Sequence, residues 1–435
     1  MKNLNPADGS LKIHLDMVGC RLNQSEIEMY ARQFRSAGHS IVADAGEADL
    51  VVINTCSVTA AAASDSRQKA RQAYRAGARQ IALTGCWSTL APQPAASLPG
   101  VVAVIPNAEK GGLVQEILGI PLEEFDLEPA AREPLPGARL RTRAFIKVQD
   151  GCDNRCTFCV TTLARGASRS RTVEAVIGDI QAAVMGGAQE AVLTGVHLGA
   201  WGHDFDPAAS LKDLIAAILD RSDLPRLRLS SLEPWDLDGE FFQMWDDPRL
   251  CRHLHLPLQS GSESTLRRMA RKTTPDSFRE LLESARSAVP AIAVTTDIIV
   301  GFPGETETEF ADSLAFVQEQ AFAGGHVFTY SARQGTAAAR MPDQVPFTTR
   351  KIRNQVMRES LAEDGARFQS SFIGKELPTL WETTTEMGPE TWRLHGLTDN
   401  GLRVTSDARR DAWNQITPVR ITGFASGGLE GIIPS

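Results

Sequence analysis

Three cysteines within eight residues form the densest group of reactive side chains in this sequence. The segment DGCDNRCTFCV, residues 150–160, contains Cys152, Cys156 and Cys159, in a chain of 435 residues with seven cysteines. Three thiols are one ligand short of a closed tetrahedral zinc site. They can instead hold three corners of a cubane iron–sulfur cluster, which four cysteines would saturate. One iron then stays open, and an open coordination position is typical of a catalytic metal site.

An open iron of this kind can chelate the amino and carboxylate groups of S-adenosylmethionine and pass one electron to its sulfonium. The resulting 5′-deoxyadenosyl radical abstracts hydrogen atoms from unreactive C–H bonds. The spacing Cys-x3-Cys-x2-Cys resembles the signature of the radical-SAM superfamily, in which an aromatic residue at the position of Phe158 packs near the cofactor adenine. The alternatives are a zinc knuckle that borrows a distant ligand, and cysteines that only fill the core.

Three further cysteines, Cys20, Cys56 and Cys86, are widely spaced in the N-terminal part of the chain. Scattered core thiols are the ordinary interpretation of such spacing. Each cysteine, however, directly follows an apolar segment typical of a strand: LDMVGC, VVINTC and IALTGC. The carboxyl ends of parallel strands meet along one edge of a doubly wound sheet. The three thiols can therefore converge on one point.

The apolar patterns predict an α/β fold with three structured parts. Residues 11–118 alternate short apolar runs with helical patterns, which predicts a doubly wound parallel sheet covered on both faces. Six strand patterns then alternate with helices and predict a partial (βα)6 barrel, whose sites lie at the carboxyl ends of the strands. These patterns cover residues 143–149, 190–195, 226–231, 252–258, 293–300 and 325–331. From residue 373 onward, short strand patterns predict a small β-barrel.

These patterns give the expected domain boundaries. A chain of this length is too long for one typical domain. We expect an N-terminal domain over residues 1–122, a linker rich in proline and acid over 123–138, the central barrel over 139–368 and the small barrel over 369–435.

Composition and charge narrow the class of protein. The chain is 42% hydrophobic and 23% charged, which is ordinary for a globular protein. It has neither an apolar run of roughly 18 residues, as a membrane span needs, nor the layout of a signal peptide, so we expect a cytoplasmic protein with no membrane partner. Thiols are reduced in that compartment, which favours metal binding over disulfides.

Positive charge gathers around the first cysteine group. The net charge is −8, but residues 132–171 hold nine Lys and Arg against three Asp and Glu. This local excess suggests an anionic partner, although a solvated basic surface is an equally simple interpretation.

The cysteine segments together resemble one family, the methylthiotransferases. The matching segments are GCRLNQSEIEM, INTCSVT, LTGCW and GCDNRCTFCVTTLARGASRSR, and the resemblance extends from about residue 13 to 433. It implies two 4Fe-4S clusters, S-adenosylmethionine as cofactor and a C-terminal TRAM domain, whose ends FIGKELPTLWE and VRITGFASGGLEG match. The catalytic residues and cluster ligands are then Cys20, Cys56 and Cys86 for an auxiliary cluster, and Cys152, Cys156 and Cys159 for the radical cluster. Cys251 matches neither set, so we expect a buried structural thiol.

The same resemblance suggests cofactor contacts. LTGVH at residues 193–197 and DIIVGFPGET at 297–306 correspond to superfamily loops, although Glu305 is one residue further on than usual. The expected cofactor-binding residues are Phe158, Thr194, Gly195, Ser230, Gln259, Val300 and Gly301.

The resemblance also implies a substrate. Members of the family modify isopentenyladenosine in tRNA, threonylcarbamoyladenosine in tRNA, or an aspartate of a ribosomal protein. NTCSVTAAAASDSRQKARQ, LTGVHLG, LRLSSLEP, HLHLPLQSGS and YSARQGTAAARM favour the second branch, which implies methylthiolation at C2 of that nucleoside next to the anticodon. The other two branches, a radical-SAM oxidoreductase with a relay cluster, and an iron–sulfur RNA-binding protein remain alternatives.

The implied partners are a tRNA anticodon stem-loop, an electron donor such as flavodoxin or ferredoxin, and a sulfur source. TRAM domains usually bind RNA, yet residues 366–435 hold seven Lys and Arg against eight Asp and Glu. The expected RNA-binding residues are Arg165, Arg169, Arg171, Arg393 and Arg420.

Overall fold

The computed structural model describes residues 9–120 and 142–434, and the predicted linker over 123–138 lies outside these ranges. The described chain divides into two compact units. The first contains the chain up to residue 154 together with residues 160–186 and 194–196, and the second contains residues 155–159, 187–193 and 197 onward. The division passes through the loop that carries Cys152, Cys156 and Cys159. The three domain boundaries expected from the sequence stay a prediction.

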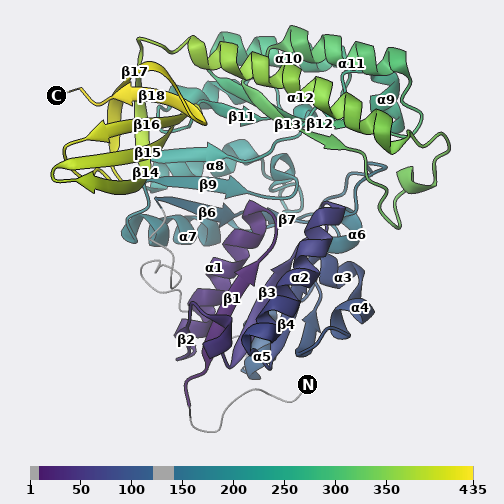
Figure 1. Cartoon of the computed structure of the whole chain (residues 1–435), viewed down its shortest axis with the longest axis vertical. Helices are drawn as coiled ribbons and strands as arrows, with labels where there is room; N and C mark the ends of the chain where they lie inside the picture. Colours follow the sequence, from purple (N-terminus) through teal and green to yellow (C-terminus); the bar gives the residue numbers. More distant parts are fainter. Residues whose placement is uncertain (1–8, 121–141, 435) are drawn as a thin grey trace. The chain divides into compact units, whose positions relative to one another are not determined.

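The first unit contains a five-stranded parallel sheet with the order β2-β1-β3-β4-β5 (Figure 1). Its strands are β1 (Lys12–Met17), β2 (Ser40–Ile41), β3 (Leu50–Thr55), β4 (Ile81–Gly85) and β5 (Val101–Ile105). The connecting helices are α1 (Arg21–Ser36), α2 (Ala60–Ala76), α3 (Cys86–Leu90), α4 (Pro92–Ala96) and α5 (Leu113–Leu118). The predicted doubly wound sheet is confirmed. Strand β2 was not predicted, because two residues are too few to show a pattern.

Both faces of this sheet are buried, because helices pack on each side of it. Leu50 and Val52 of β3 pack in one apolar core with residues of α1 and α5. Val51 and Ile53 point the other way and pack with residues of α2, α3 and α4. A strand buried on both faces reads as a continuous apolar run, which is why VVIN in β3 shows no alternation.

The first unit also contains the chain on either side of the cysteine loop. Its elements are β6 (Arg143–Lys147), β7 (Gln149–Asp150), α6 (Thr161–Arg165), β8 (Arg169–Ser170) and α7 (Val173–Met185). Strands β7 and β8 pair antiparallel, which closes the base of the loop. The N–H of Val148 donates to the carbonyl of Thr194 at 3.0 Å. Helix α1 packs on β6, and α6 packs on α3, so these elements pack against helices that cover the five-stranded sheet.

The second unit carries the remaining strands of the predicted central barrel. Strand β9 (Glu190–Thr194) pairs in parallel with β10 (Arg226–Leu229), and β12 (Ala293–Val300) pairs in parallel with both β11 (His253–His255) and β13 (Gly324–Thr329). Isolated bridges place β11 beside β10. Between the strands lie α8 (Leu211–Arg221), α9 (Glu263–Arg268), α10 (Pro275–Ala288) and α11 (Glu307–Gln320). The predicted strands are found, although β11 is three residues long where seven were predicted.

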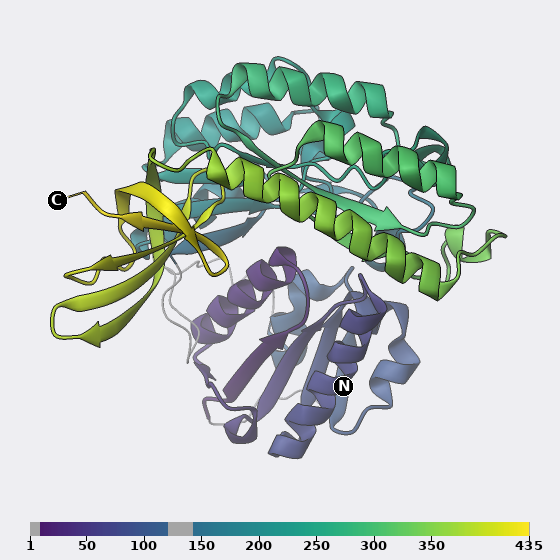
Figure 2. The ribbon, with the colours of Figure 1, turned by 45° about the horizontal axis from the view of Figure 1, so that its top comes forward.

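A long helix leads from this sheet to a closed C-terminal barrel. Helix α12 (Phe347–Ser370) packs beside β13 and α11 and ends at the barrel, as Figure 2 shows. The barrel has the order β14-β15-β16-β18-β17, and its strands are β14 (Glu376–Gly388), β15 (Thr391–Thr398), β16 (Arg403–Ala408), β17 (Ile416–Ala425) and β18 (Gly428–Ile432). The predicted small β-barrel is confirmed. Within the described ranges, no helix is long and apolar enough to cross a membrane.

Two buried arginines of β10 hold this barrel against the sheet. Arg226 donates to the carbonyls of Pro378 at 2.8 Å and Leu397 at 3.1 Å. Arg228 donates to the carbonyl of Thr398 at 3.0 Å. Backbone carbonyls that face an interface need such donors, because a buried unsatisfied acceptor is costly.

Arg228 is at the same time the partner of a buried carboxylate. Its Nε lies 2.7 Å from Glu190 Oε1 and its Nη2 lies 3.0 Å from Oε2. The Sγ of Cys251 lies 3.7 Å from the same carboxylate, and burial raises the pKa of this thiol to about 12. Cys251 is buried, as predicted, and its role as a structural thiol stays a prediction.

We expect the Arg228→Met variant to lose stability. Removing one partner of a buried pair leaves the Glu190 carboxylate uncompensated, which typically costs about 3–5 kcal/mol. Urea unfolding of the metal-free protein should show this loss. The double variant Glu190→Gln/Arg228→Met should lose less than Arg228→Met alone, because no buried charge remains, and an equal or larger loss would contradict this account.

Candidate active site

The first three thiols lie at the carboxyl ends of adjacent strands. Cys20 follows β1, Cys56 follows β3 and Cys86 follows β4, and β3 is the middle strand of the three. In this register Met17 lies opposite Asn54, and Thr55 lies opposite Gly85. Burial raises the pKa of Cys56 to about 11, and the charges of Cys20 and Cys86 act in the same direction. The structure therefore brings the three predicted thiols to one edge of the sheet, within electrostatic range of one another.

Two glycines allow these strand ends to approach. Gly19 has a φ of +112°, and a Cβ there would lie 2.7 Å from both Cβ and Sγ of Cys56. Gly85 has a φ of +96°, and a Cβ there would lie 2.6 Å from the nitrogen of Thr55. A side chain at either position would meet both steric overlap and backbone strain. The glycines that precede Cys20 and Cys86 thus set the spacing of the thiol triad.

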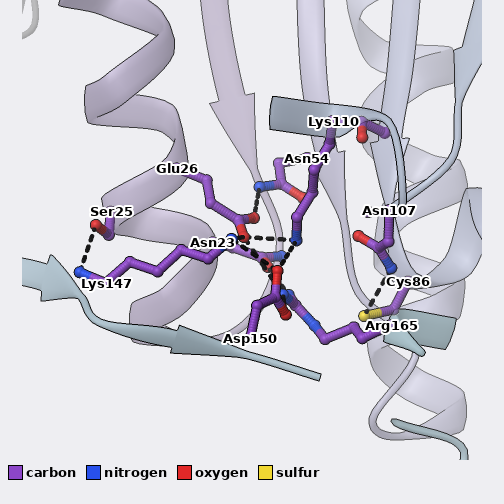
Figure 3. Close-up of polar contacts among 12 residues, drawn as sticks. Asn23, Ser25, Glu26, Asn54, Cys86, Asn107, Lys110, Lys147, Asp150 and Arg165 are labelled. Atoms are coloured by element: carbon purple, nitrogen blue, oxygen red, sulfur yellow. Dashed lines mark hydrogen bonds and ion pairs between the residues drawn. The ribbon is translucent and has the colours of Figure 1, made fainter. Parts of the chain in front are cut away.

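A largely buried network of five charged side chains lies near Cys86, one of these thiols (Figure 3). Glu26 Oε1 lies 2.5 Å from Lys110 Nζ and 2.9 Å from Lys147 Nζ. Arg165 Nη1 lies 3.3 Å from the same oxygen and 2.8 Å from Asp150 Oδ1. Asp150 Oδ2 in turn lies 2.7 Å from Lys147 Nζ. One carboxylate on α1 thus meets cations from three separate segments of the first unit.

The cations keep both carboxylates of this network ionised. Burial would raise the pKa of Glu26, but Lys147, Lys110 and Arg165 hold it well below its usual range. The pKa of Asp150 is also lowered, because the same three cations outweigh its burial. Ionised groups this deep are tolerated only with close partners of opposite sign.

Asparagine side chains connect the network to the thiols. Arg165 Nη2 donates to Asn23 Oδ1 at 2.9 Å, and Cys20 Sγ lies 3.7 Å from the same oxygen. Asn107 Nδ2 lies 3.6 Å from Cys86 Sγ and donates to the carbonyl of Ala164 at 2.7 Å. Burial alone would lower the pKa of Arg165, yet it is held well above its ordinary value by Glu26, by Asp150 and by the Cys86 and Cys20 thiols.

The loop with the second thiol triad is anchored at both ends. In the first unit, the N–H of Cys152 donates to the carbonyl of Gly166 at 3.0 Å, and the N–H of Asn154 lies 3.4 Å from Cys152 Sγ. In the second unit, the N–H of Thr157 donates to the carbonyl of Met269 at 3.1 Å, and the N–H of Cys159 donates to the carbonyl of Cys156 at 3.1 Å. The Cys152, Cys156 and Cys159 residues are each partly exposed.

A buried arginine also lies beside Cys156. Arg271 Nη1 lies 3.8 Å from Cys156 Sγ, and Arg271 Nη2 lies 2.6 Å from a Glu233 carboxylate oxygen. The guanidinium carbon sits 4.5 Å from the ring centroid of Trp235. Burial raises the pKa of Cys156, and Arg271 acts against this. Sequence reasoning missed Arg271, because nothing near it in the chain resembles a thiol ligand.

The predicted cofactor residue Phe158 lies in a small aromatic cluster of the second unit. Its ring meets Phe302 edge-on at 6.4 Å, and Phe302 meets Tyr330 at 5.3 Å. The hydroxyls of Tyr330 and Ser230 are buried, and within the part of the chain that the structure describes neither has a hydrogen-bond partner. Buried hydroxyls normally have partners. A polar ligand at the carboxyl ends of β10 and β13, such as S-adenosylmethionine, would supply hydrogen-bond partners for these two hydroxyls.

The other predicted cofactor residues lie at strand ends as expected. Thr194 is the last residue of β9 and Gly195 follows it, while Val300 ends β12. Gln259 has a φ of +74° and forms an isolated bridge with Ile298 of β12. These positions agree with contacts to a ligand, and the contacts themselves stay a prediction.

Glu305, displaced by one residue from the usual pattern, still serves the Gly301 turn. Its carboxylate accepts a hydrogen bond from the N–H of Gly301 at 2.6 Å and pairs with Arg353 at 2.7 Å. A Cβ at Gly301 would overlap the stem of Arg350.

The donor sets fit a cubane cluster better than a single ion. Within residues 9–120 and 142–434, no three His, Cys, Asp or Glu side chains lie close enough to share one metal ion. A cubane is wider than an ion and binds each thiolate at a different iron. Three soft thiolates, spread over neighbouring strand ends in Cys20, Cys56 and Cys86, are such a donor set.

The five arginines predicted to bind RNA divide into four groups. Arg165 is buried and its guanidinium faces Glu26 and Asp150, so the prediction that it contacts RNA is wrong. Arg171 pairs with the buried Asp179 at 2.6 Å. Arg169 is exposed, and its guanidinium donates to the carbonyl of Arg165 at 3.4 Å. Of the two barrel arginines, Arg393 is partly exposed and Arg420 is exposed, and each pairs with a carboxylate, Arg393 with Asp407 and Arg420 with Glu376, at 3.0 Å in both cases.

Two family models match this chain, and each covers one of the two thiol triads. Residues 146–317 match the radical SAM superfamily. Residues 12–106 match a family described as the uncharacterized protein family UPF0004.

Curated relatives match nearly the whole chain. The protein named threonylcarbamoyladenosine tRNA methylthiotransferase MtaB of Bacillus subtilis is 35% identical over 426 residues, covering 93% of this chain and 92% of that protein. The protein of the same name in Thermotoga maritima is 37% identical and covers 85% and 86%. A tRNA-2-methylthio-N(6)-dimethylallyladenosine synthase of Oceanobacillus iheyensis is 30% identical and covers 95% and 82%.

Solved structures share the fold at low identity. The radical S-adenosylmethionine methyltransferase TsrM of Kitasatospora setae, with cobalamin and a 4Fe-4S cluster bound, superposes with a TM-score of 0.58 at 14% identity and covers 76% of this chain and 77% of that one. The cobalamin-dependent radical enzyme OxsB gives a TM-score of 0.50 at 11% identity and covers 81% and 56%. At such identity the likeness concerns the fold alone.

We expect the Gly19→Ala variant to lose one cluster selectively. The new methyl group would displace Cys56, so iron after anaerobic reconstitution should fall from about eight per chain to about four. Gly38→Ala is a matched control, because Gly38 also has a positive φ, of +84°, but no atom within 4 Å of a Cβ. Equal iron contents in the two variants would contradict the steric account.

Proposed function

Because this chain belongs to the methylthiotransferase family, in the branch of the threonylcarbamoyladenosine tRNA enzymes, we propose that it adds a methylthio group to C2 of N6-threonylcarbamoyladenosine next to the tRNA anticodon. The observation that carries this proposal is the presence of both thiol triads in one chain that matches these enzymes over most of its length. The relatives of this branch are 32–37% identical, against 30% for the dimethylallyladenosine enzyme. Mass spectrometry of tRNA nucleosides from cells with and without the gene tests this choice.

The cofactors are two 4Fe-4S clusters and S-adenosylmethionine. We assign Cys152, Cys156 and Cys159 to the radical cluster and Cys20, Cys56 and Cys86 to the auxiliary cluster. When bound, these groups would supply a 5′-deoxyadenosyl radical, a methyl group and an open iron that can hold the sulfur to be transferred.

The chain's own residues prepare the site for these groups. Arg271 places a positive charge beside Cys156, which favours its thiolate form. Phe158 provides an aromatic surface that contacts Phe302, and Phe302 in turn contacts Tyr330, whose hydroxyl is buried. The hydroxyl of Ser230 can then hydrogen-bond a polar group of the bound nucleoside.

The remaining parts of the proposal concern partners. Reductive chemistry needs an electron donor, such as flavodoxin or ferredoxin, and methylthiolation needs a sulfur source. We assign the C-terminal barrel as a TRAM domain that assists tRNA binding, and a cytoplasmic location follows from a tRNA substrate. Among the predicted RNA-binding arginines, Arg169 is the best remaining candidate, because it is exposed and lies on β8, which closes the cysteine loop.

Alanine variants of the two thiol triads should lose different products. Replacing Cys152, Cys156 or Cys159 with alanine should abolish cleavage of S-adenosylmethionine to 5′-deoxyadenosine. Replacing Cys20, Cys56 or Cys86 should leave that cleavage measurable while no methylthio group reaches the tRNA. Chromatography of 5′-deoxyadenosine and of digested tRNA measures both products.

Cys251→Ala is the control for loss of a thiol outside the triads, and it should retain both products. Far-UV circular dichroism must match the wild type in every variant. A folded Cys56→Ala variant that still methylthiolates tRNA would overturn the assignment of the auxiliary triad.

The affinity for an anticodon stem-loop should fall steeply with salt, because phosphate contacts release counterions. Arg169→Gln should weaken binding and reduce the salt slope by about one. Fluorescence anisotropy at several salt concentrations measures both. Arg75→Gln, at the exposed end of α2, is the control for loss of one surface charge. A slope that Arg169→Gln leaves unchanged would remove Arg169 from the interface.

A further inference from the structure

The buried network beside the first thiol triad has an excess of positive charge. Its cations are Lys110, Lys147 and Arg165, and its anions are Glu26 and Asp150, so three positive charges face two negative ones. Glu26, Lys110, Arg165 and Asp150 are at most 5% exposed. The Lys147 side chain is 19% exposed, so water screens the extra charge only in part, and a largely buried charge without a counterpart is unfavourable.

The polar side chains around the network do not remove this excess. Asn23 and Asn54 bond Arg165 and Glu26 respectively, but both are neutral. The groups next to the network that can become anionic are the thiols. Asn23 joins Arg165 to Cys20, and Asn107 joins Cys86 to Ala164, the neighbour of Arg165.

We propose that Arg165 is a positioning residue for the auxiliary cluster, holding a buried positive charge that balances the anion formed when Cys20, Cys56 and Cys86 bind it. This inference rests on the proposed function only in that the triad binds a 4Fe-4S cluster. Three thiolates outweigh the charge of an oxidised cubane core by about one unit, which equals the excess of the network. The network and the loaded triad together are then neutral.

The proposal has a consequence for the redox properties of the cluster. Reduction adds negative charge, and a fixed positive charge nearby favours the reduced form. Arg165→Gln removes that charge, so it should make the auxiliary cluster harder to reduce. Glu26→Gln removes a negative charge from the same network, so it should make the cluster easier to reduce. A residue that only supports the fold would not give shifts of opposite sign.

The redox potential of the auxiliary cluster must be measured in a protein that lacks the radical cluster. In the full-length chain, replacing Cys152, Cys156 and Cys159 with alanine leaves only the first triad. This parent and its variants are reconstituted anaerobically with iron and sulfide, without tRNA or S-adenosylmethionine. Iron per chain is determined, and the midpoint potential is measured by electron paramagnetic resonance during a redox titration.

At the parent's midpoint potential, Arg165→Gln should lower the ratio of reduced to oxidised cluster at least about tenfold, which corresponds to about 59 mV for a one-electron couple. Arg165→Lys keeps the charge and should stay near the parent. Glu26→Gln should raise the ratio. Arg75→Gln, which removes an exposed charge from the same unit, should leave it unchanged.

Each other outcome is informative. If all variants bind four irons and share one potential, the inference is overturned while the cluster assignment stands. If the parent binds no iron, the cluster assignment of the proposed function fails instead. If Arg165→Gln binds no iron but Arg165→Lys does, the positive charge at this position is what the cluster needs, and the inference is supported. If neither variant binds iron, Arg165 has only a structural role, and the inference is overturned.

Discussion

A single carboxylate, that of Glu26, meets cations from three segments, and the first unit depends on this contact. Glu26 lies on α1, while Lys110, Lys147 and Arg165 come from the end of the N-terminal domain, from β6 and from α6. These elements are joined through the chain by residues 121–141 and by the cysteine loop. The ion pairs bind them directly, so the helix that follows the radical motif is fixed to the sheet that carries the auxiliary triad.

The elements and the cysteines could be predicted because their signals are local. Strand β3 shows itself as a continuous apolar run, and Cys56 stands directly after it. Parallel strands then have one possible geometry for their carboxyl ends. Two glycines, Gly19 and Gly85, complete that geometry, and their importance is visible only when the strands are placed side by side.

The charge network could not be predicted, because its partners are far apart in the chain. Arg165 and Glu26 are separated by 139 residues, and Arg165 and Asn23 by 142. Counting charges over residues 132–171 shows a basic excess, yet Arg165 and Lys147 in this window pair with the distant Glu26, and Arg171 pairs with Asp179, which lies just outside the window. A count of basic residues in one segment therefore indicates an exposed basic surface only where no acidic residue from a distant part of the chain pairs with them.

Beside side-chain contacts such as those of Asp399 with Arg252 and of Asn414 with the carbonyl of Gly187, the attachment of the C-terminal barrel to β10 uses main-chain atoms on the barrel side. Arg226 and Arg228 bind the carbonyls of Pro378, Leu397 and Thr398, and every residue type offers the same carbonyl. The barrel is thus recognised by the path of its backbone and hardly by its side chains at these points. A change of residue type at Pro378, Leu397 or Thr398 would therefore keep these acceptors in place as long as the path of the barrel strands is unchanged.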